Sequence, residues 1–464
     1  MAESANPTLT ALSILASQNP SIHYIPPSSP DFDQLRAIYA HPELTPLAIL
    51  RPTTESALAA TVSFLASNKI DFTLRAGGHD MHGRSTKNNT VVIDLRLLND
   101  VTIDPATSTA TVAGGALIHD VVTALQPAGY ITPIGSIASV GYVGWAMYGG
   151  YGTYSSRFGL GVDQIVAARV VTAAGEIVTA DAGAGSELLK AIRGGGGAFG
   201  VLVQVTIRVY KLETILAGIL VFDSADLSKV VREFSQGYRA LSSERVPAAL
   251  GVHQVVLNFP TPTFGVLVMW ADEDLAGGER WVDKICSLAP VVSRNVAPTT
   301  PLAWLEEQSK LVAQSTQGRM WTVNLRAITD EVAGVIGDFT SRFPADPHAL
   351  FDLHELRAAS PSATASGAGK DSVFNARDPH FVVEICPTVS DEGKLEGALA
   401  WGQEFCDALK ATDKENILGA SYVSFLAADE FNHQRVYGED LGFLRDVKGR
   451  VDPGNVFRNA ISYL

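Results

Sequence analysis

The three glycine clusters that most constrain this chain all lie before residue 211. The first, Arg75-Ala76-Gly77-Gly78-His79, comes after a helical pattern and a short β-type run that ends at Leu74. Adjacent glycines after a strand form a tight turn whose backbone N–H groups can converge on an anion, and pyrophosphate is the usual one. Arg75 adds positive charge before the turn, and His79 adds a nucleophilic imidazole after it. The motif is weak by itself, because two glycines beside a histidine are common in ordinary loops.

The second cluster spans residues 135–152, and bulky apolar residues such as Trp145 and Tyr148 separate its glycines. Glycine lets a backbone pass close to a flat ligand, and a flexible Gly/Ser linker would lack the bulky residues. The third cluster, residues 193–200, leads into an alternating strand pattern at 203–209. Together with the first cluster, this region predicts a surface where the backbone approaches a ligand closely.

Secondary-structure patterns divide the chain near residue 211. Before it, residues 47–74 read as strand, helix and strand, with the first glycine turn at the C-terminal end of the second strand, where α/β folds place ligands. After it, long β-type runs alternate with helical runs, which predicts a separate α+β domain on a mixed or antiparallel sheet. The β-type runs are at 217–222, 252–258, 264–270, 321–325 and 381–387, and the helical runs at 227–241, 278–288, 329–342 and 393–409. Residues 361–370, rich in Ser, Ala and Gly, are a candidate mobile lid.

Composition narrows the class of protein. The chain has 464 residues, of which 46% are apolar and 18% charged, as in soluble globular proteins. A formal net charge of −14 argues against a nucleic acid or an anionic membrane as partner. The scattered cysteines Cys286, Cys386 and Cys406 are expected to be free thiols in a reducing compartment. No basic signal region is present at the N-terminus, and the apolar run at 215–222 is too short to span a membrane, so we expect a cytoplasmic enzyme.

Four motifs stand in the order found in a known family. They are Arg-x-Gly-Gly-His from residue 75, the glycine-rich run through 149–152 with Arg-Phe-Gly-Leu at 157–160, Arg-Gly-Gly-Gly-Gly-Ala-Phe-Gly-Val at 193–201, and Asp-Pro-Gly-Asn-Val-Phe-Arg at 452–458. The chain resembles the FAD-linked oxidoreductases of the vanillyl-alcohol oxidase/PCMH superfamily, in the berberine-bridge-enzyme-like branch that includes 6-hydroxynicotine oxidases. The resemblance covers nearly the whole chain.

The resemblance implies an α+β fold in three parts. A PCMH-type FAD-binding domain of two α/β subdomains is expected over residues 1–210. A substrate domain with a mostly antiparallel sheet is expected over residues 211–417. A C-terminal segment, residues 418–464, is expected to pack back on the FAD domain.

The resemblance also implies that His79 is bonded to the flavin 8α carbon, which would raise the redox potential of the flavin. Many members attach FAD a second time through the cysteine of Gly-x-Cys-x-x-Val-Gly, where this chain has Ile137, so we predict a single covalent attachment. A small residue at Val140 suits access of O2 and hence an oxidase. The residues expected to contact FAD are Arg75, Ala76, Gly77, Gly78, His79, Asp80, Ser85, Ser136, Ser139, Val140, Gly141, Gly144, Tyr148, Gly149, Tyr151, Gly152, Gly197, Val201 and Asn455.

The implied reaction moves a hydride from an alcohol or amine carbon of a small, secondary-metabolite-like substrate to flavin N5, and O2 then reoxidises the flavin to give H2O2. The motif does not identify the residue that accepts the proton, because the family's Tyr-x-Asn-Tyr-like segment reads Tyr-Val-Ser-Phe at 422–425. The expected catalytic residues are Tyr148, Tyr422 and Glu384, with Tyr151 and His253 as further candidates. For each of them a packing or pairing role is the alternative.

Two other functions are consistent with the same flavin-binding motifs. A flavin-holding cyclase or isomerase without net redox, or an inactive flavin-fold binding protein, are the alternatives to an oxidase. A metal site is not expected: His79-x-x-His82 is followed by Gly83 and lacks a third ligand, and His354-Glu355 lacks the second histidine of a zinc protease helix. The expected partners are a small-molecule substrate and O2, and the chain is expected to be a monomer or a homodimer.

Overall fold

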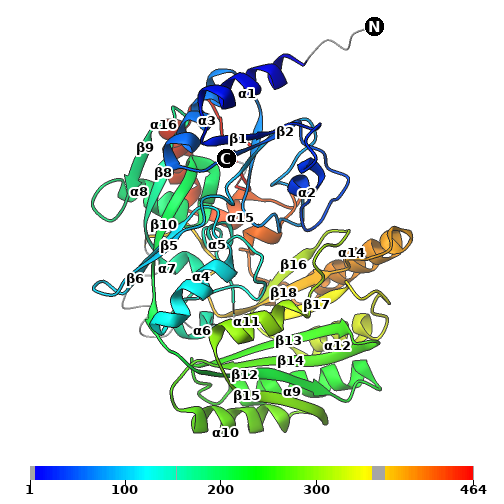
Figure 1. Ribbon diagram of the computed structural model, residues 1–464. Coiled ribbons are helices and arrows are strands. Elements are labelled where there is room, and N and C mark those ends of the chain that lie inside the picture. The colour runs from blue at the N-terminus through cyan, green and yellow to red at the C-terminus, as the bar shows by residue number, and fades with distance from the viewer. Residues whose placement is uncertain (1–5, 153, 358–370, 463) are drawn as a thin grey trace.

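The computed structural model describes residues 6–152, 154–357, 371–462 and 464 (Figure 1). Its first sheet has the strand order β1-β2-β4-β3, with β1 (Ile22–Ile25), β2 (Ala48–Pro52), β3 (Phe72–Arg75) and β4 (Val91–Asp94). Strands β2, β4 and β3 are parallel, and β1 is antiparallel to β2. Helices α1 (Pro7–Gln18) and α2 (Phe32–Arg36) accompany this sheet. The candidate lid at 361–370 lies outside the described residues.

Helix α3 (Glu55–Ser67) joins β2 to β3, as the strand, helix and strand pattern predicts. The helix begins after Thr54, whose side chain accepts a hydrogen bond from the Ala57 N–H and so caps the helix. Leu58, Val62 and Leu65 lie on one face of the helix and are fully buried in the core beneath the first sheet. Burial of this face fixes the end of β3, and therefore the start of the first glycine turn.

The second sheet packs with helices in the first half of the chain, and each of its strand pairs is antiparallel. Its order is β5-β6-β10-β8-β9, with β5 (Val101–Asp104), β6 (Thr109–Ala113), β8 (Ile165–Val171), β9 (Ile177–Ala180) and β10 (Val201–Arg208). The short turn at Gly175, with φ of 80°, joins β8 to β9, and a turn that short permits only antiparallel pairing. Helices α4 (Ile118–Leu125) and α8 (Ser186–Gly195) pack against this sheet.

The second glycine cluster is not a continuous loop. One short helix, α5 (Tyr142–Ala146), lies within it, and two more, α6 (Ser155–Phe158) and α7 (Gly161–Gln164), follow it. Between α5 and α6 the chain turns at Gly149 and Gly150, with φ of 130° and 75°. A small ladder of β7 (Tyr130–Ile131) and β11 (Tyr210–Lys211) lies at the edge of this part of the molecule.

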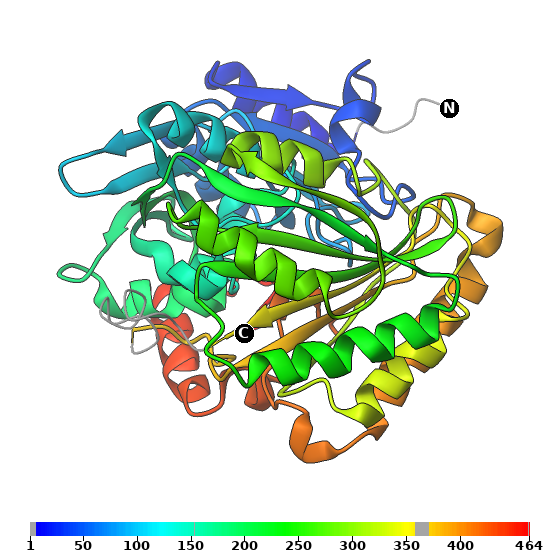
Figure 2. The same cartoon turned by 90° about the horizontal axis from the view of Figure 1, so that it is seen from below.

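Seven antiparallel strands form the third sheet, which confirms the expected antiparallel architecture after residue 211. Its order is β15-β12-β14-β13-β17-β18-β16, with β12 (Ile215–Phe222), β13 (Leu250–Asn258), β14 (Pro262–Trp270), β15 (Val291–Thr299), β16 (Trp321–Leu325), β17 (Leu350–Leu356) and β18 (His380–Cys386). Helices α9 (Leu227–Ser242), α10 (Leu275–Cys286), α12 (Asp330–Thr340) and α14 (Leu395–Ala411) cover its outer side (Figure 2). The sequence patterns missed β15, β17 and helix α11 (Pro301–Ser309).

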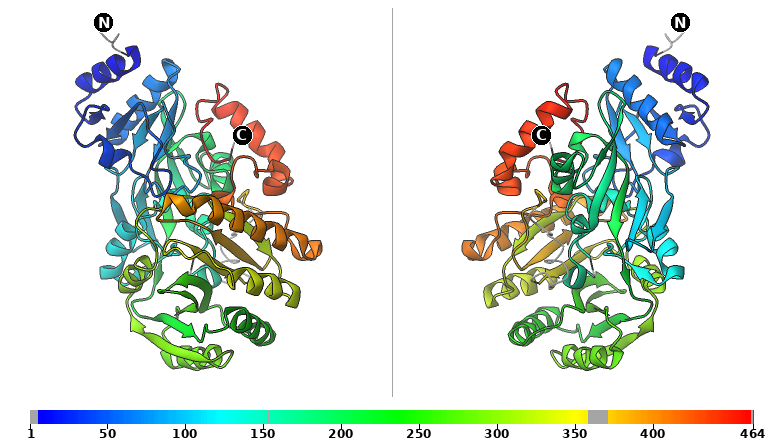
Figure 3. Two further views of the ribbon diagram at one scale, coloured as in Figure 1. Left: turned by 90° about the vertical axis from the view of Figure 1, so that its right-hand side faces the viewer. Right: turned by 90° about the vertical axis from the view of Figure 1, so that its left-hand side faces the viewer.

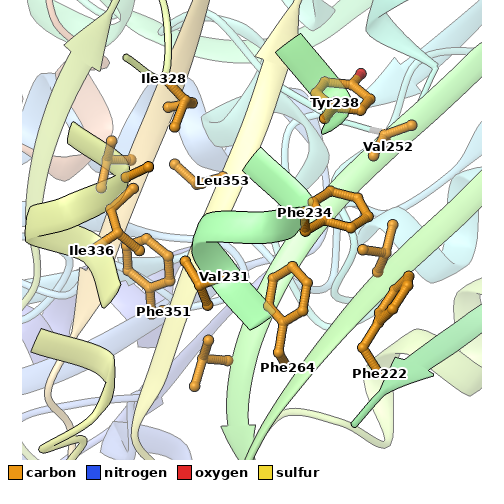
Figure 4. Packing of buried hydrophobic residues seen from close by; sticks show 14 of the residues in the cluster. Phe222, Val231, Phe234, Tyr238, Val252, Phe264, Ile328, Ile336, Phe351 and Leu353 are labelled. Carbon is orange, nitrogen blue, oxygen red and sulfur yellow. The ribbon is translucent and has the colours of Figure 1, made fainter. Parts of the chain in front are cut away.

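Alternation along β17 separates the two faces of this sheet. Phe351 and Leu353 point to the helix-covered side and pack with Phe234 and Phe264 (Figure 4). Asp352 follows Phe351 and His354 follows Leu353, and successive side chains of a strand point to opposite faces. Asp352 and His354 therefore lie on the other side of the sheet, which faces the first half of the chain.

The C-terminal segment returns to the first half of the chain. Helices α15 (His433–Tyr437) and α16 (Asp440–Val451) follow α14, and Leu444 of α16 packs with Ala198 and Phe199. Beyond α16, the Asp452 carboxylate accepts hydrogen bonds from the backbone N–H groups of Val456 and Phe457. In Figure 3 the N-terminal elements, in blue, and α16, in red, lie on opposite flanks of the green strands between them. The domain boundaries near residues 210 and 417 stay a prediction. None of the described helices has the length and apolar character needed to cross a bilayer.

Candidate active site

A cavity of about 370 Å³ lies between the glycine clusters and the third sheet. One wall comes from residues 76–85 and 135–148, and the opposite wall from strands β13, β17 and β18. Residues 422–425 and 457–461 of the C-terminal segment complete the lining. The cavity thus joins the parts of the chain that carry the sequence motifs, and a pocket at such a junction is the usual place for a ligand.

Backbone contact makes the first wall. A Cβ atom added to Gly77 would lie 2.3 Å from the Ser139 carbonyl oxygen and 2.5 Å from the Gly141 nitrogen. A Cβ on Gly141 would in turn lie 2.7 Å from the Ala76 Cβ. Gly78 adopts a φ of 74°, which L side chains rarely tolerate. The two glycine clusters can therefore lie against one another only because side chains are missing at the contact.

His79 stands at the end of this glycine contact. Its Nε2 atom lies 2.8 Å from the Ser139 Oγ, and its ring stacks on Tyr39 at a centroid distance of 4.5 Å. Burial, together with the charge of Arg75, lowers the pKa of His79 to about 4. The imidazole is therefore neutral near neutral pH, which is its nucleophilic form.

The Arg84 side chain ties the His79 loop to the C-terminal segment. Arg84 Nε donates to the Asp80 Oδ2 at 2.6 Å, and Asp80 Oδ1 accepts from the His82 N–H at 2.7 Å. The Arg84 guanidinium also donates to the carbonyl oxygens of Ser424 at 2.7 Å and Leu426 at 2.9 Å. His82 Nε2 pairs with the Phe425 carbonyl at 3.0 Å, so His82 and His79 serve different partners and do not form a metal pair.

The first wall fits FAD. The hydroxyls of Ser85 and Ser136 are buried and lack a protein partner among the described residues, and both residues line the cavity. Buried hydroxyls are rarely left unpaired, so a polar ligand is the expected partner. The close glycine backbone and the neutral His79 provide a surface suited to a flat, phosphate-bearing cofactor.

Most residues expected to contact FAD meet at the cavity. Its lining includes Ala76, Gly77, Gly78, His79, Asp80, Ser85, Ser136, Val140, Gly141, Gly144, Tyr148, Tyr151 and Gly197. Arg75, Ser139, Gly149, Gly152, Val201 and Asn455 are not among the lining residues. Arg75 donates to the carbonyls of Leu35 and Ala37 and so braces the loop from behind. Contact of each residue with FAD stays a prediction.

The opposite wall carries a polar cluster of four side chains on one face of the third sheet. The strand register pairs His253 with His354, and Asp352 with Glu384. His354 Nε2 lies 3.1 Å from Asp352 Oδ2 and 3.0 Å from Glu384 Oε1. The His253 ring stands edge-on to the His354 ring at a centroid distance of 3.9 Å. Asp352, His354 and Glu384 line the cavity, whereas His253 lies behind them.

The pKa shifts of this cluster follow from burial and pairing. Burial disfavours charge on His354, but the two carboxylates prevail and raise its pKa well above the usual range. Burial also acts against ionisation of Asp352, yet His354 holds the pKa of that carboxyl below its usual range. Burial raises the pKa of Glu384, while His354 opposes the shift. Burial and the neighbouring His354 lower the pKa of His253 to about 3, so His253 is neutral.

Side-chain ligand atoms of His253, Asp352 and His354 lie within 4.8 Å of one another, a spacing that a metal ion could bridge. His354 Nε2, however, already contacts both carboxylates. The described geometry is that of an ion-pair network.

The candidate tyrosines are less suited to accept a proton. The Tyr148 oxygen accepts from the Gly197 N–H at 3.1 Å, and burial raises the pKa of Tyr148 to about 12. The Tyr151 hydroxyl pairs with His380 Nε2 at 2.9 Å, and the Tyr422 ring packs edge-on against Tyr151. Burial raises the pKa of both Tyr151 and Tyr422 above the usual range. Their hydroxyls therefore stay protonated, which leaves Glu384 as the candidate base best placed in the cavity.

Sequence reasoning gave no site role to Tyr39, Asp352 and His354, which are among the residues that line the cavity. No motif marks Tyr39. Asp352 and His354 alternate with Phe351 and Leu353, and this period of two residues marks a strand with one apolar and one polar face. Attention to that alternation would have found them.

Comparison with known proteins identifies the family. An FAD binding domain model matches residues 46–181, and a berberine and berberine-like model matches residues 421–462. The FAD-linked oxidoreductase aurO of Gibberella zeae is 32% identical over 457 residues, covering 97% of this chain and 87% of aurO.

Solved structures agree on the fold. The structure of 6-hydroxy-D-nicotine oxidase from Arthrobacter nicotinovorans has a TM-score of 0.83 at 23% identity, covering 95% of this chain and 97% of that one. Glucooligosaccharide oxidase from Acremonium strictum, which carries a 6-S-cysteinyl, 8α-N1-histidyl FAD, has a TM-score of 0.82 at 16% identity over 96% of this chain and 97% of that one. The match to aurO spans the cavity and both of its walls, so this chain belongs to the berberine-bridge-like FAD-linked oxidoreductases and is an FAD-dependent oxidoreductase.

Proposed function

We propose that this protein is an FAD-dependent oxidase of a small, largely apolar alcohol or amine, with Glu384 as the proton acceptor. The observation that carries the proposal is the placement of Glu384 on the cavity wall that faces His79 and the glycine contact. A carboxylate on that wall can take a proton from a substrate that lies between the walls. When bound, FAD would supply the hydride acceptor at N5, and O2 would reoxidise the flavin and be reduced to H2O2.

The substrate is held by the chain's own side chains. The third sheet and its neighbours line the cavity with Leu257, Leu311, Val312, Ala313, Met320 and Pro347. These residues exclude water and favour an apolar, secondary-metabolite-like substrate, whose single donor group turns to the polar cluster. Glu384 accepts the O–H or N–H proton as the neighbouring carbon gives up its hydride.

His79 is proposed to bond covalently to the flavin 8α carbon. Support comes from its neutral imidazole and from Ser139 Oγ, which holds Nε2 and leaves Nδ1 as the bonding atom. Ile137, which lines the same wall, replaces the cysteine of doubly attached relatives, and we propose that the attachment is single. Val140 also lines this wall, as expected for a residue that governs the approach of O2.

Acid denaturation tests the cofactor assignment. Wild-type protein is expected to keep yellow flavin in the precipitate, and His79→Ala to release it. The exposed His119→Ala serves as the matched control and should behave as wild type. Flavin released freely from wild type would contradict the covalent bond, and absence of flavin would contradict the cofactor assignment.

Substrate bleaching tests the reaction class. Under anaerobic conditions an oxidase substrate should bleach the flavin absorbance, and admission of air should restore it with release of H2O2. A cyclase or isomerase would turn over substrate without bleaching, and an inactive binding protein would do neither.

A further inference from the structure

We propose that His354 and Asp352 are positioning residues that set the proton affinity of Glu384: His354 is a buried cation that keeps Glu384 ionised, and Asp352 is the anion that opposes it. This inference rests on the proposed function, in which Glu384 accepts the proton of the substrate. It adds a reason why a buried carboxylate can act as a base at neutral pH.

The first step is a conflict between two carboxylates. Asp352 and Glu384 are directly opposite on the neighbouring strands β17 and β18, and both are about nine-tenths buried. Opposed residues on one sheet face have Cβ atoms about 4.5–5.5 Å apart. When two side chains that close both carry an ionised carboxylate away from water, each carboxylate raises the pKa of the other. Without a cation, one of the two would hold a proton.

His354 supplies the cation. It is two residues beyond Asp352 on the same strand, so its side chain lies on the same face. Its Nε2 reaches both carboxylates, at 3.1 Å and 3.0 Å, whereas the His253 ring stands edge-on to the ring of His354. A charge-assisted hydrogen bond stabilises the ionised carboxylate more than a neutral donor does.

The other titratable groups around Glu384 carry no charge at neutral pH. His253, on β13, is neutral because burial lowers its pKa to about 3. Cys386, two residues beyond Glu384 on β18, stays a thiol because burial raises its pKa. Tyr422, from the C-terminal segment, keeps its proton for the same reason. His354 and Asp352 are therefore the charges that act on Glu384.

The opposite charges of His354 and Asp352, both on the neighbouring strand β17, give an opposed pair of variants. His354→Gln keeps an N–H donor but removes the cation, so Glu384 should bind its proton more tightly. Asp352→Asn keeps the shape of the side chain but removes the anion, so Glu384 should bind its proton more weakly. A purely structural role for either residue would not shift the two variants in opposite directions.

The test is a pH titration of the flavin-loaded enzyme from about pH 4 to about pH 9. Infrared difference spectroscopy of the protonated carboxyl band is the readout at each pH. No substrate is needed, and the band missing in Glu384→Gln identifies Glu384. We expect the midpoint of this band to rise by about one pH unit or more in His354→Gln, a tenfold change in proton affinity, and to fall in Asp352→Asn. A midpoint that moves in neither variant, or in the same direction in both, would overturn the proposal.

Controls keep the outcome decisive. Far-ultraviolet circular dichroism and the visible flavin spectrum show whether each variant is folded. If His354→Gln does not fold, the isosteric Asp352→Asn carries the test, and an unchanged midpoint there overturns the proposal. Failure of the proposed function is separate: if Glu384→Gln reduces its flavin with substrate as fast as wild type, Glu384 is not the acceptor, whatever the titration gives.

Discussion

The cavity wall that carries His79 depends on close backbone contact between two glycine clusters, whereas the wall that carries Glu384 depends on side chains that adjacent strands present. At the first wall, Gly77 and Gly141 each approach residues of the facing glycine cluster so closely that a Cβ atom would not fit. At the second wall, the regular register of β17 and β18 brings Asp352 and Glu384 together. The first wall therefore depends on which residues lack a side chain, and the second on which charges the strands present.

This difference predicts two kinds of sensitivity. A backbone wall should fail abruptly when any side chain is added, because backbone atoms cannot move away by changing rotamer. A wall made of side chains should keep its structure after an isosteric substitution, but its chemistry should respond when the substitution changes a charge. Four substitutions test the comparison, in order of decreasing effect.

Gly77→Ala should have the largest effect. The new Cβ would lie 2.3 Å from the Ser139 oxygen and 2.5 Å from the Gly141 nitrogen, so the two glycine clusters must separate. Ser139 also holds His79, so we expect the loss of nearly all covalently bound flavin. The ratio of flavin to protein absorbance measures this loss. Normal flavin content would show that the clusters need not touch.

Glu384→Gln changes charge at the other wall with almost no change in shape. Flavin should bind as in wild type, but flavin reduction by substrate should slow by about 10²–10⁴-fold, the usual contribution of a general base. Anaerobic stopped-flow absorbance measures the rate with a substrate found by its H2O2 release. The exposed Glu306→Gln is the matched control and should leave the rate unchanged. Loss of flavin in Glu384→Gln would mean that this wall is also needed to bind the cofactor.

The two walls also differ in how far the sequence predicts them. Gly77, Gly78 and His79 are contiguous, so their motif marks the first wall without any knowledge of the fold. Asp352 and Glu384 are separated by 32 positions and meet only because β17 pairs with β18, and the sequence patterns missed β17. The sequence patterns also did not predict that the second sheet is antiparallel throughout, because the direction of neighbouring strands depends on connections that propensity does not report.

Tyr151→Phe tests a bond that joins the two halves of the chain. Its hydroxyl pairs with His380 Nε2 of β18 at 2.9 Å, and both groups are buried. Loss of this hydrogen bond should lower the free energy of unfolding by about 0.5–1.5 kcal/mol. Denaturant unfolding monitored by circular dichroism measures the change. Tyr24→Phe, whose part-buried hydroxyl donates to the Leu9 carbonyl at 3.3 Å, should have less effect. Equal changes in the free energy of unfolding would show that the hydrogen bond between the two halves stabilises the fold no more than the one made by Tyr24.

Gly449→Ala should have the smallest effect, and one of opposite sign to Gly77→Ala. Gly449 is an exposed residue of α16, and a Cβ placed there meets no atom within 4 Å. Alanine is the better helix former, so the variant should be more stable by about 0.5–1 kcal/mol, with unchanged flavin content. The same denaturant unfolding experiment measures the gain. A loss of flavin in Gly449→Ala would mean that glycine substitution harms the fold in general, and the contrast with Gly77 would then say nothing about a wall made of backbone.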